Sequence, residues 1–135
     1  MFSNILVPVD GSKFDTESIN TAIEIASKFN SSITAVHVLH EFSLSSYSDD
    51  EDNGDEILKK VTEKAKLKDI NVIEHLITGD PLRDMETIIR KSNADLIVIN
   101  SCGKDSLKEE GPRNYLGSVV SRVIKTSTIP TLIIK

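Results

Sequence analysis

The sequence has few of the features that mark membrane, secreted or disulfide-bonded proteins. A single cysteine among 135 residues allows no internal disulfide and no zinc site made of cysteines. No apolar run approaches the ~20 residues that a membrane-spanning helix needs. The first apolar run, 5–9, is too short for the core of a signal peptide and contains a proline. We therefore expect a cytoplasmic protein that makes no membrane contact.

Positive charge is also scarce. Sixteen Lys and Arg residues face 21 Asp and Glu residues, which gives a net charge of −5. Seven acidic residues and no basic residue lie in 41–56, so this segment carries −7 while the rest of the chain carries +2. Neither part has the clustered Lys and Arg of a nucleic-acid-binding surface. Residues 41–55 have few apolar side chains to bury, and we expect them to form a mobile acidic loop.

The chain does contain a regular alternation of two kinds of segment. Apolar runs of strand length alternate with segments whose apolar residues recur at helical spacing. We expect strands at 4–9, 33–39, 71–77, 96–99 and 131–134, and helices at 15–29, 56–69, 81–92 and 118–126. This order predicts one α/β domain over 1–135, with parallel strands and helices on both faces of the sheet. Ligands of such sheets bind beyond the carboxyl ends of the strands.

Two of these carboxyl ends carry residues that suit an anionic ligand. The fourth strand leads through a loop to Gly117 and Ser118, and we expect Ser118 to be the N-cap of the last helix. A helix N-terminus offers free N–H groups and the positive end of the helix dipole. The first strand is followed by Asp10, Gly11 and Ser12, a polar turn at the same edge of the sheet.

Six short motifs, in order along the chain, resemble those of the universal stress protein family. They are PVDGS at 8–12, HV at 37–38, GDP at 79–81, ADLIVINS at 94–101, GS at 117–118 and PTLIIK at 130–135. The resemblance implies a three-layer α/β/α domain whose five-stranded parallel sheet has the order 3-2-1-4-5, as in adenine nucleotide alpha hydrolase-like folds. It also implies a homodimer formed through the last strand, residues 131–135.

The ATP-binding branch of that family has a glycine motif, G-x2-G-x9-G-[ST], which this chain keeps only in part. Asn100 stands where the first glycine is expected, and thirteen residues instead of nine separate Gly103 from Gly117. We place the four extra residues near 109–113. Asparagine adopts left-handed backbone conformations more readily than most residues, but its side chain occupies space that a ligand would otherwise use.

The resemblance implies an adenine-nucleotide site, with ATP or AMP as the ligand. Val9 and Val38 would line the adenine and the ribose, and Ile99 and Asn100 would flank the base. Asp10 would bond the ribose, or a phosphate bridged to it by Mg²⁺.

The phosphates would be held at the start of the last helix and in the loop before it. The residues that the resemblance assigns to them are Gly103, Gly117, Ser118 and Val119. Close approach of backbone N–H groups at the glycines and the hydroxyl of Ser118 would supply the contacts.

Each of these residues also has a simpler explanation. Asp10 can cap the first helix or the turn that leads into it, and Gly103 and Gly117 can relieve backbone strain in a long loop. His37 lies among apolar neighbours, where a hydrogen-bonded structural histidine is expected. Cys102 is taken as a loop residue because sequence shows no cause for a lowered thiol pKa.

The function that we expect is that of an adenine-nucleotide-binding regulator or sensor without efficient catalysis. The sequence has no G-x-S-x-G elbow, no Walker loop and no G-x-G-x-x-G after the first strand, although slow ATP hydrolysis stays open. The alternative is an interaction module of the same fold that leaves the site empty and binds unknown protein partners. A phosphoacceptor built on Asp10 is disfavoured, because it needs a lysine after the fifth strand and Lys135 is the last residue.

Overall fold

The computed structural model describes the backbone of residues 1–40, 47–102 and 117–135, and the side chains of these residues except 40–52. Strands and helices alternate throughout these ranges. In order they are β1 (Asn4–Pro8), α1 (Asp15–Phe29), β2 (Ser32–His40), α2 (Tyr47–Lys66), β3 (Val72–Gly79), α3 (Pro81–Ser92), β4 (Leu96–Asn100), α4 (Ser118–Thr126) and β5 (Thr131–Ile134).

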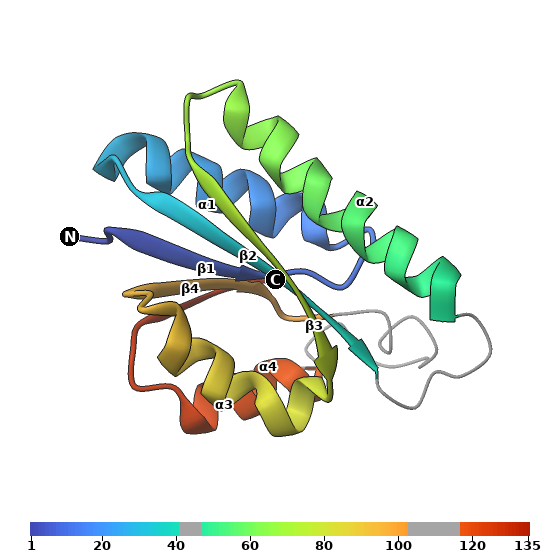
Figure 1. Ribbon diagram of the computed structural model, residues 1–135. Helices are drawn as coiled ribbons and strands as arrows, with labels where there is room; N and C mark the ends of the chain where they lie inside the picture. Colours follow the sequence, from blue (N-terminus) through green and yellow to red (C-terminus); the bar gives the residue numbers. More distant parts are fainter. Residues whose placement is uncertain (41–46, 103–116) are drawn as a thin grey trace.

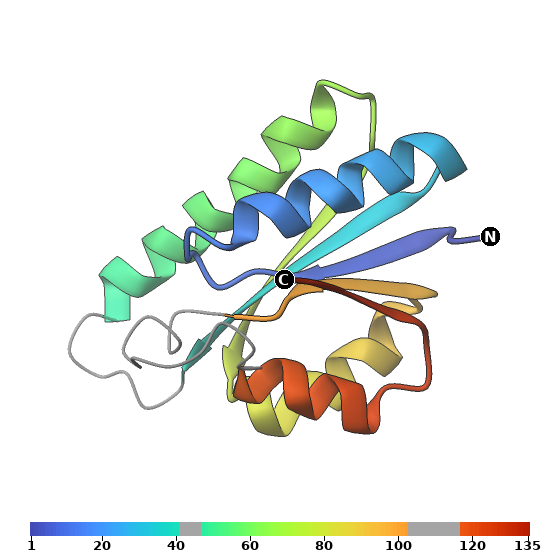
Figure 2. The same ribbon diagram turned by 180° about the vertical axis from the view of Figure 1, so that it is seen from behind.

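The strands form one parallel sheet in the order β3-β2-β1-β4-β5. The central strand β1 pairs with β2 on one side, Ile5 opposite Ile33, and with β4 on the other, Ile5 opposite Leu96. Helices α1 and α2 cover one face, and α3 and α4 cover the other (Figures 1 and 2). The predicted fold class and strand order are confirmed.

Alternation along the strands divides the interior into two cores. Ile5 and Val7 of β1 pack with α1 and α2, whereas Leu6 packs with α3 and α4. All three side chains are fully buried. Because β1 is covered on both faces, its sequence is a continuous apolar run instead of an alternating one.

Helix α2 is longer than predicted at its amino end. It begins at Tyr47 instead of residue 56, and it ends at Lys66 instead of residue 69. The expected loop over 41–55 is therefore wrong for 47–55, and 41–46 lie outside the described residues. Acidic residues at the start of a helix complement its dipole, so the segment that looked like a loop favours a helix N-terminus.

Close packing around Gly54 explains why α2 contains a glycine. Gly54 is buried, and a Cβ placed on it would lie 2.6 Å from Leu76 Cδ1 and 3.3 Å from His37 Cδ2. The helix backbone therefore packs directly against side chains of β2 and β3. This close approach offsets the low helix propensity of glycine.

The two helices on the other face differ in how they begin. Asp80 is the N-cap of α3, as predicted, and its carboxylate accepts a hydrogen bond from Leu82 N at 2.8 Å. The predicted N-cap of α4 is wrong, because Gly117 occupies that position and Ser118 is the first helical residue. None of the helices within the described ranges combines the length and the apolar character that crossing a membrane requires.

Candidate functional site

Hydrogen bonds join the carboxyl ends of β1 and β2 next to the loop that follows β1. Val9, which is 5% exposed, donates its N–H to Val36 O at 2.9 Å. Its carbonyl lies 2.8 Å from His37 Nδ1. A carbonyl only accepts, so His37 carries its proton on Nδ1 and donates it. The structural role predicted for His37 is confirmed, and Val9 is fixed from both sides.

The loop after β1 is organised by two aspartates. Asp10 Oδ1 accepts a hydrogen bond from Ser12 N at 2.9 Å, which is the turn-capping role that the sequence also allowed. The carboxylate of Asp15, in the first turn of α1, accepts from Gly11 N at 2.7 Å and from Asp10 N at 3.3 Å. Gly11 has φ 85°, a left-handed conformation that suits glycine. The position of Asp10 therefore depends on Asp15.

Asp15 is a buried carboxyl group beside a second carboxylate. Burial is the main cause that raises its pKa to about 7, and the neighbouring charge of Asp10 adds to the effect, while the N–H groups of Gly11 and Asp10 oppose it. Ionisation of Asp15 beside Asp10 therefore costs free energy. A cation or a hydrogen-bond donor brought to Asp10 would lower that cost.

Ser12 carries a polar atom whose partner is missing from the described residues. Its Oγ is buried and makes no hydrogen bond with any described group. Buried hydroxyls nearly always have a partner, and an exception calls for a specific explanation. A ligand oxygen bound next to Asp10 would provide one.

Asn100 lies at the carboxyl end of β4, the strand next to β1. It is 7% exposed, and its Nδ2 donates to Ser18 Oγ of α1 at 2.8 Å. It lies within the strand and is not among the residues with positive φ. The left-handed conformation that the sequence allowed at this position is therefore not used.

Helix α4 begins beside the same end of β4. Gly117 N donates to Ser101 O at 2.8 Å, which ties the start of the helix to the residue after the strand. Ser118 is exposed, and Val119 is half-buried against the core under α3 and α4. Gly103 and the expected insertion at 109–113 lie outside the described residues.

The predicted site residues thus gather at one edge of the sheet but on both of its faces. Val9 and Asn100 lie on the face that α1 covers, whereas Val38 and Ile99 pack with the core on the other face. Asp10 follows β1 between the two. The shared feature of the set is the carboxyl edge of β2, β1 and β4.

Sequence reasoning missed three residues of this site, namely Ser12, Asp15 and Ser18. A signal for two of them was present. The apolar face of α1 includes Ile19 and Ala22, and stepping back by four residues places Asp15 and Ser18 on the same buried face. Polar residues at buried positions of a helix face indicate a specific hydrogen-bond network.

A separate groove of about 390 Å³ runs along α3 on the sheet face opposite α1 and α2. Both apolar and polar side chains line it. It is lined by Leu6, Thr34, Val36, His75, Ile77, Thr78, Asp84, Thr87, Ile88, Lys91 and Ser92. None of the predicted site residues that the structure describes is among them.

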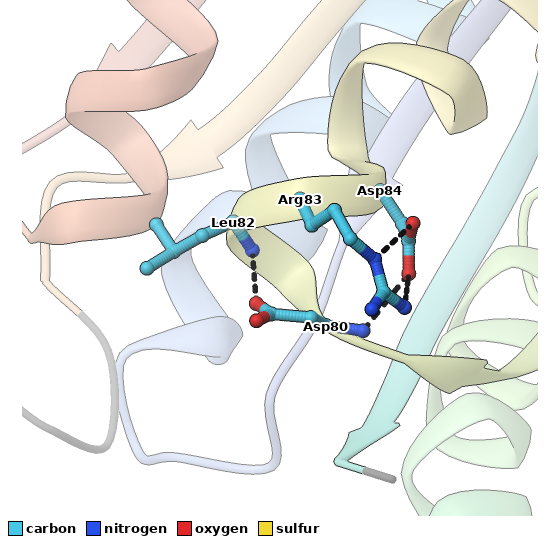
Figure 3. Close-up of polar contacts among 4 residues, drawn as sticks. All are labelled: Asp80, Leu82, Arg83 and Asp84. Carbon is cyan, nitrogen blue, oxygen red and sulfur yellow. Dashed lines mark hydrogen bonds and ion pairs between the residues drawn. The ribbon is translucent and has the colours of Figure 1, made fainter.

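One end of this groove is the β3–α3 turn, shown in Figure 3. Asp84 Oδ2 accepts from Asp80 N at 2.9 Å, and the Arg83 guanidinium bonds both oxygens of Asp84, with Nε at 3.0 Å and Nη2 at 2.9 Å. The hydrogen bond from Arg83 is the main cause that lowers the pKa of Asp84 to about 2. Within the described part of the chain, no group of His, Cys, Asp and Glu is arranged to hold a metal ion on its own.

Comparison with known proteins gives one consistent result. The universal stress protein family model matches residues 1–135. The universal stress protein MJ0531 of Methanocaldococcus jannaschii is 32% identical over all of this chain and 83% of its own length.

Solved structures have the same fold. The hypothetical protein MJ0577 of Methanocaldococcus jannaschii superposes with a TM-score of 0.83 at 24% identity, covering 100% of this chain and 96% of its own. A universal stress protein from Archaeoglobus fulgidus, solved in complex with dAMP, superposes with a TM-score of 0.76 at 22% identity, covering 98% and 97%. The motifs, the sheet order and the match along the whole sequence agree, and this chain belongs to the universal stress protein family.

Proposed function

We propose that this protein binds an adenine nucleotide, ATP or AMP, and acts in the cytoplasm as a regulator or sensor without efficient catalysis. The observation that carries the proposal is the loop after β1. Its Ser12 hydroxyl is buried without a partner among the described residues, next to Asp10 at the carboxyl edge where parallel sheets bind ligands. The dAMP complex of a relative with the same fold supports the choice of nucleotide.

The donor and acceptor groups at this edge fit a nucleotide. The Asp10 carboxylate accepts a hydrogen bond from Ser12 N, and a carboxylate has about four lone-pair sites, so it can also accept ribose hydroxyls. It can equally join a Mg²⁺ ion held by the phosphates, where the metal would neutralise charge next to Asp15. Ser12 Oγ would donate to a nucleotide oxygen.

The phosphates would lie at the start of α4, where the N–H groups of the first turn are free of intrahelical partners. Gly117, Ser118 and Val119 are the described residues there. Val9 would border the ribose and adenine from the α1 face, and Val38 and Ile99 from the other. The groove along α3 suits a phosphate less well, because the carboxylate of Asp84 stands at its end.

We propose binding without efficient turnover on the basis of the sequence motifs. No motif that places a nucleophile, a general base or an arginine finger is present, so the chemistry of rapid phosphoryl transfer is not provided for. The alternative function, an interaction module that binds no nucleotide, is favoured by Asn100 in place of the motif glycine. The two are separated by a binding experiment.

The test is thermal unfolding with Mg-ATP, with AMP and with Mg-GTP as a control, followed by titration calorimetry. A ligand at a hundred times its dissociation constant adds ~2.7 kcal/mol, which raises the midpoint by several degrees in a domain of this size. A shift with adenine nucleotides alone is expected. No shift at millimolar ligand, in protein shown to be free of copurified nucleotide, would favour the interaction module.

We also propose a homodimer through residues 131–135, which include β5. Strand β5 pairs with β4 on one side only, and Leu132 on it is 38% exposed. An edge strand with an apolar side chain is suited to pairing with a second copy. Sedimentation at micromolar concentration should give a dimer, and a monomer would overturn the proposal.

A further inference from the structure

Asn100 is the residue at which this chain departs from the glycine motif, and its side chain is hydrogen-bonded inside the protein. Its Nδ2 donates to Ser18 Oγ at 2.8 Å, and both residues are buried, at 7% and 0% exposure. The bond joins the carboxyl end of β4 to the beginning of α1. These two elements are distant in sequence, and they bound the proposed site from two sides.

The Ser18 hydroxyl fixes the direction of this bond. Its single hydrogen is donated to Asp15 O at 3.1 Å. The oxygen can then only accept from Asn100, so the amide nitrogen and not the amide oxygen must face Ser18. A glycine at position 100 would leave this buried acceptor without its donor, which costs free energy.

Asp15 continues the connection into the loop. It lies one turn before Ser18 in α1, and its carboxylate accepts from Gly11 N and Asp10 N. Hydrogen bonds therefore join β4 to Ser18 and Ser18 to the backbone carbonyl of Asp15, and the side chain of the same Asp15 bonds the backbone of Asp10 and Gly11.

We propose that Asn100 is a positioning residue of the nucleotide site, holding the first turn of α1 and thereby Asp10 at a fixed place relative to β4 and α4. The inference rests on the proposed function. It reverses the expectation that Asn100 obstructs the ligand, because the side chain is turned to α1. Replacing Asn100 with glycine should then weaken nucleotide binding.

The first part of the test uses the protein without ligand. Amide hydrogen exchange by NMR is measured for Asp10 and Gly11, with the Val9 amide, bonded to Val36 O, as an internal reference. The variants are Asn100→Ala and Ser18→Ala. The control is Thr34→Val, which removes a part-buried hydrogen bond, from Thr34 Oγ1 to Asn4 Oδ1 at 2.9 Å, toward the amino ends of β1 and β2.

Exchange at Asp10 and Gly11, relative to Val9, should be several-fold faster in Asn100→Ala and Ser18→Ala and unchanged in Thr34→Val. Unchanged exchange in the first two variants would overturn the proposal. An equal increase in Thr34→Val would also overturn it, because the effect would then reflect general loss of stability.

The second part is titration calorimetry with AMP and Mg-ATP. Loss of the hydrogen bond between Asn100 and Ser18 should weaken binding by about three- to tenfold in Asn100→Gly, Asn100→Ala and Ser18→Ala. The double variant Asn100→Ala/Ser18→Ala should bind no more weakly than the weaker single variant, because both remove the same bond. Thr34→Val should bind normally. Tighter binding by Asn100→Gly would show obstruction and overturn the proposal.

The two proposals fail in different ways. If the unmodified protein binds no adenine nucleotide, the proposed function fails, while the exchange rates still decide whether Asn100 holds the Asp10 loop. If it binds nucleotide and the variants bind equally well with unchanged exchange, only the role of Asn100 is overturned.

Discussion

The loop after β1 and the turn after β3 each contain two aspartates with the same pattern of hydrogen bonds, but the pKa of the second aspartate is shifted in opposite directions. In each, an aspartate after the strand accepts an N–H from two residues on, Asp10 from Ser12 and Asp80 from Leu82. In each, a second aspartate in the first turn of the following helix accepts the N–H of the first, Asp15 in one case and Asp84 in the other. The two turns therefore share these two aspartate hydrogen bonds.

The difference lies in how the second carboxylate is neutralised. Asp84 is partly exposed and bonded by Arg83 through both oxygens, so its pKa is lowered to about 2. Asp15 is 8% exposed and next to Asp10, so its pKa is raised to about 7. The turn after β3 is electrostatically complete by itself. In the loop after β1 two carboxyl groups, those of Asp10 and Asp15, lie close together, and the Ser12 hydroxyl is buried without a partner among the described residues, which is why we propose the ligand site there.

The largest expected difference between the two turns is in how stability depends on pH. The folded pKa of Asp15 lies above its ordinary value of 3.8, so its contribution is complete below about pH 4 and is lost as the pH rises through 7, at ~1.4 kcal/mol per pH unit. As the pH rises from 5 to 8, the free energy of unfolding of Asp15→Asn should therefore increase by ~2–3 kcal/mol relative to that of the unmodified protein. Urea denaturation in buffer without nucleotide or Mg²⁺ measures this.

Asp84→Asn is the matched control, because the pKa of Asp84 is shifted in the direction opposite to that of Asp15. The folded pKa of Asp84 is lowered, so its contribution is present above about pH 4 and is lost as the pH falls through about 2. The profile of Asp84→Asn should run parallel to that of the unmodified protein between pH 5 and pH 8. If Asp15→Asn also runs parallel, the charge of Asp15 is already compensated and the comparison of the two turns fails.

Much of the fold could be predicted from the sequence because the strands and helices have strong local signals. Continuous apolar runs indicated β1 and β4, and Asp80 followed by a proline indicated the start of α3. The start of α2 was missed because the segment before residue 56 is polar and contains Gly54, although its acidic residues suit a helix N-terminus and Gly54 packs against Leu76 and His37. The N-cap of α4 was assigned one residue late, since Gly117 and Ser118 are both favourable N-cap residues.

The site could be predicted only as an edge of the sheet. Asp10 was found because it follows an apolar run, and the place of Asn100 because the motif marks it. The orientation of the Asn100 side chain was not predictable, because it depends on Ser18, a residue far away in the sequence. The partnerless Ser12 hydroxyl is likewise a property of packing. The sequence therefore predicts where the site lies, and the three-dimensional contacts show how the side chains of Asn100 and Ser12 are placed.

The next largest difference should appear in nucleotide affinity. Asp10→Ala should lower affinity for adenine nucleotides at least tenfold, about 1.4 kcal/mol, because it removes the acceptor for the ribose or the Mg²⁺ ligand. Asp80→Ala removes the equivalent side chain of the other turn and should leave affinity unchanged, while it lowers stability by ~1 kcal/mol through loss of the N-cap of α3. Titration calorimetry and urea denaturation of both variants give the comparison.

A second variant guards against misfolding as the cause of lost binding. Gly117→Val at the start of α4 should also lower affinity at least tenfold, because its side chain would occupy the approach to the first-turn N–H groups. Unchanged affinity in both Asp10→Ala and Gly117→Val would show that nucleotide, if bound, lies elsewhere, and the groove along α3 would be examined next.

The smallest difference concerns the glycines of the two turns, which are needed for different reasons. Gly11 has φ 85°, so Gly11→Ala should cost ~1 kcal/mol in stability, and Gly11→Asn should cost less because asparagine tolerates the left-handed region. Gly79 has no positive φ, but a Cβ on it would meet the Asp84 carboxylate, which bonds Asp80 N. Asparagine should therefore be no better than alanine at position 79. Equal costs for alanine and asparagine at position 11, measured by urea denaturation, would mean that space and not backbone conformation selects glycine in both turns.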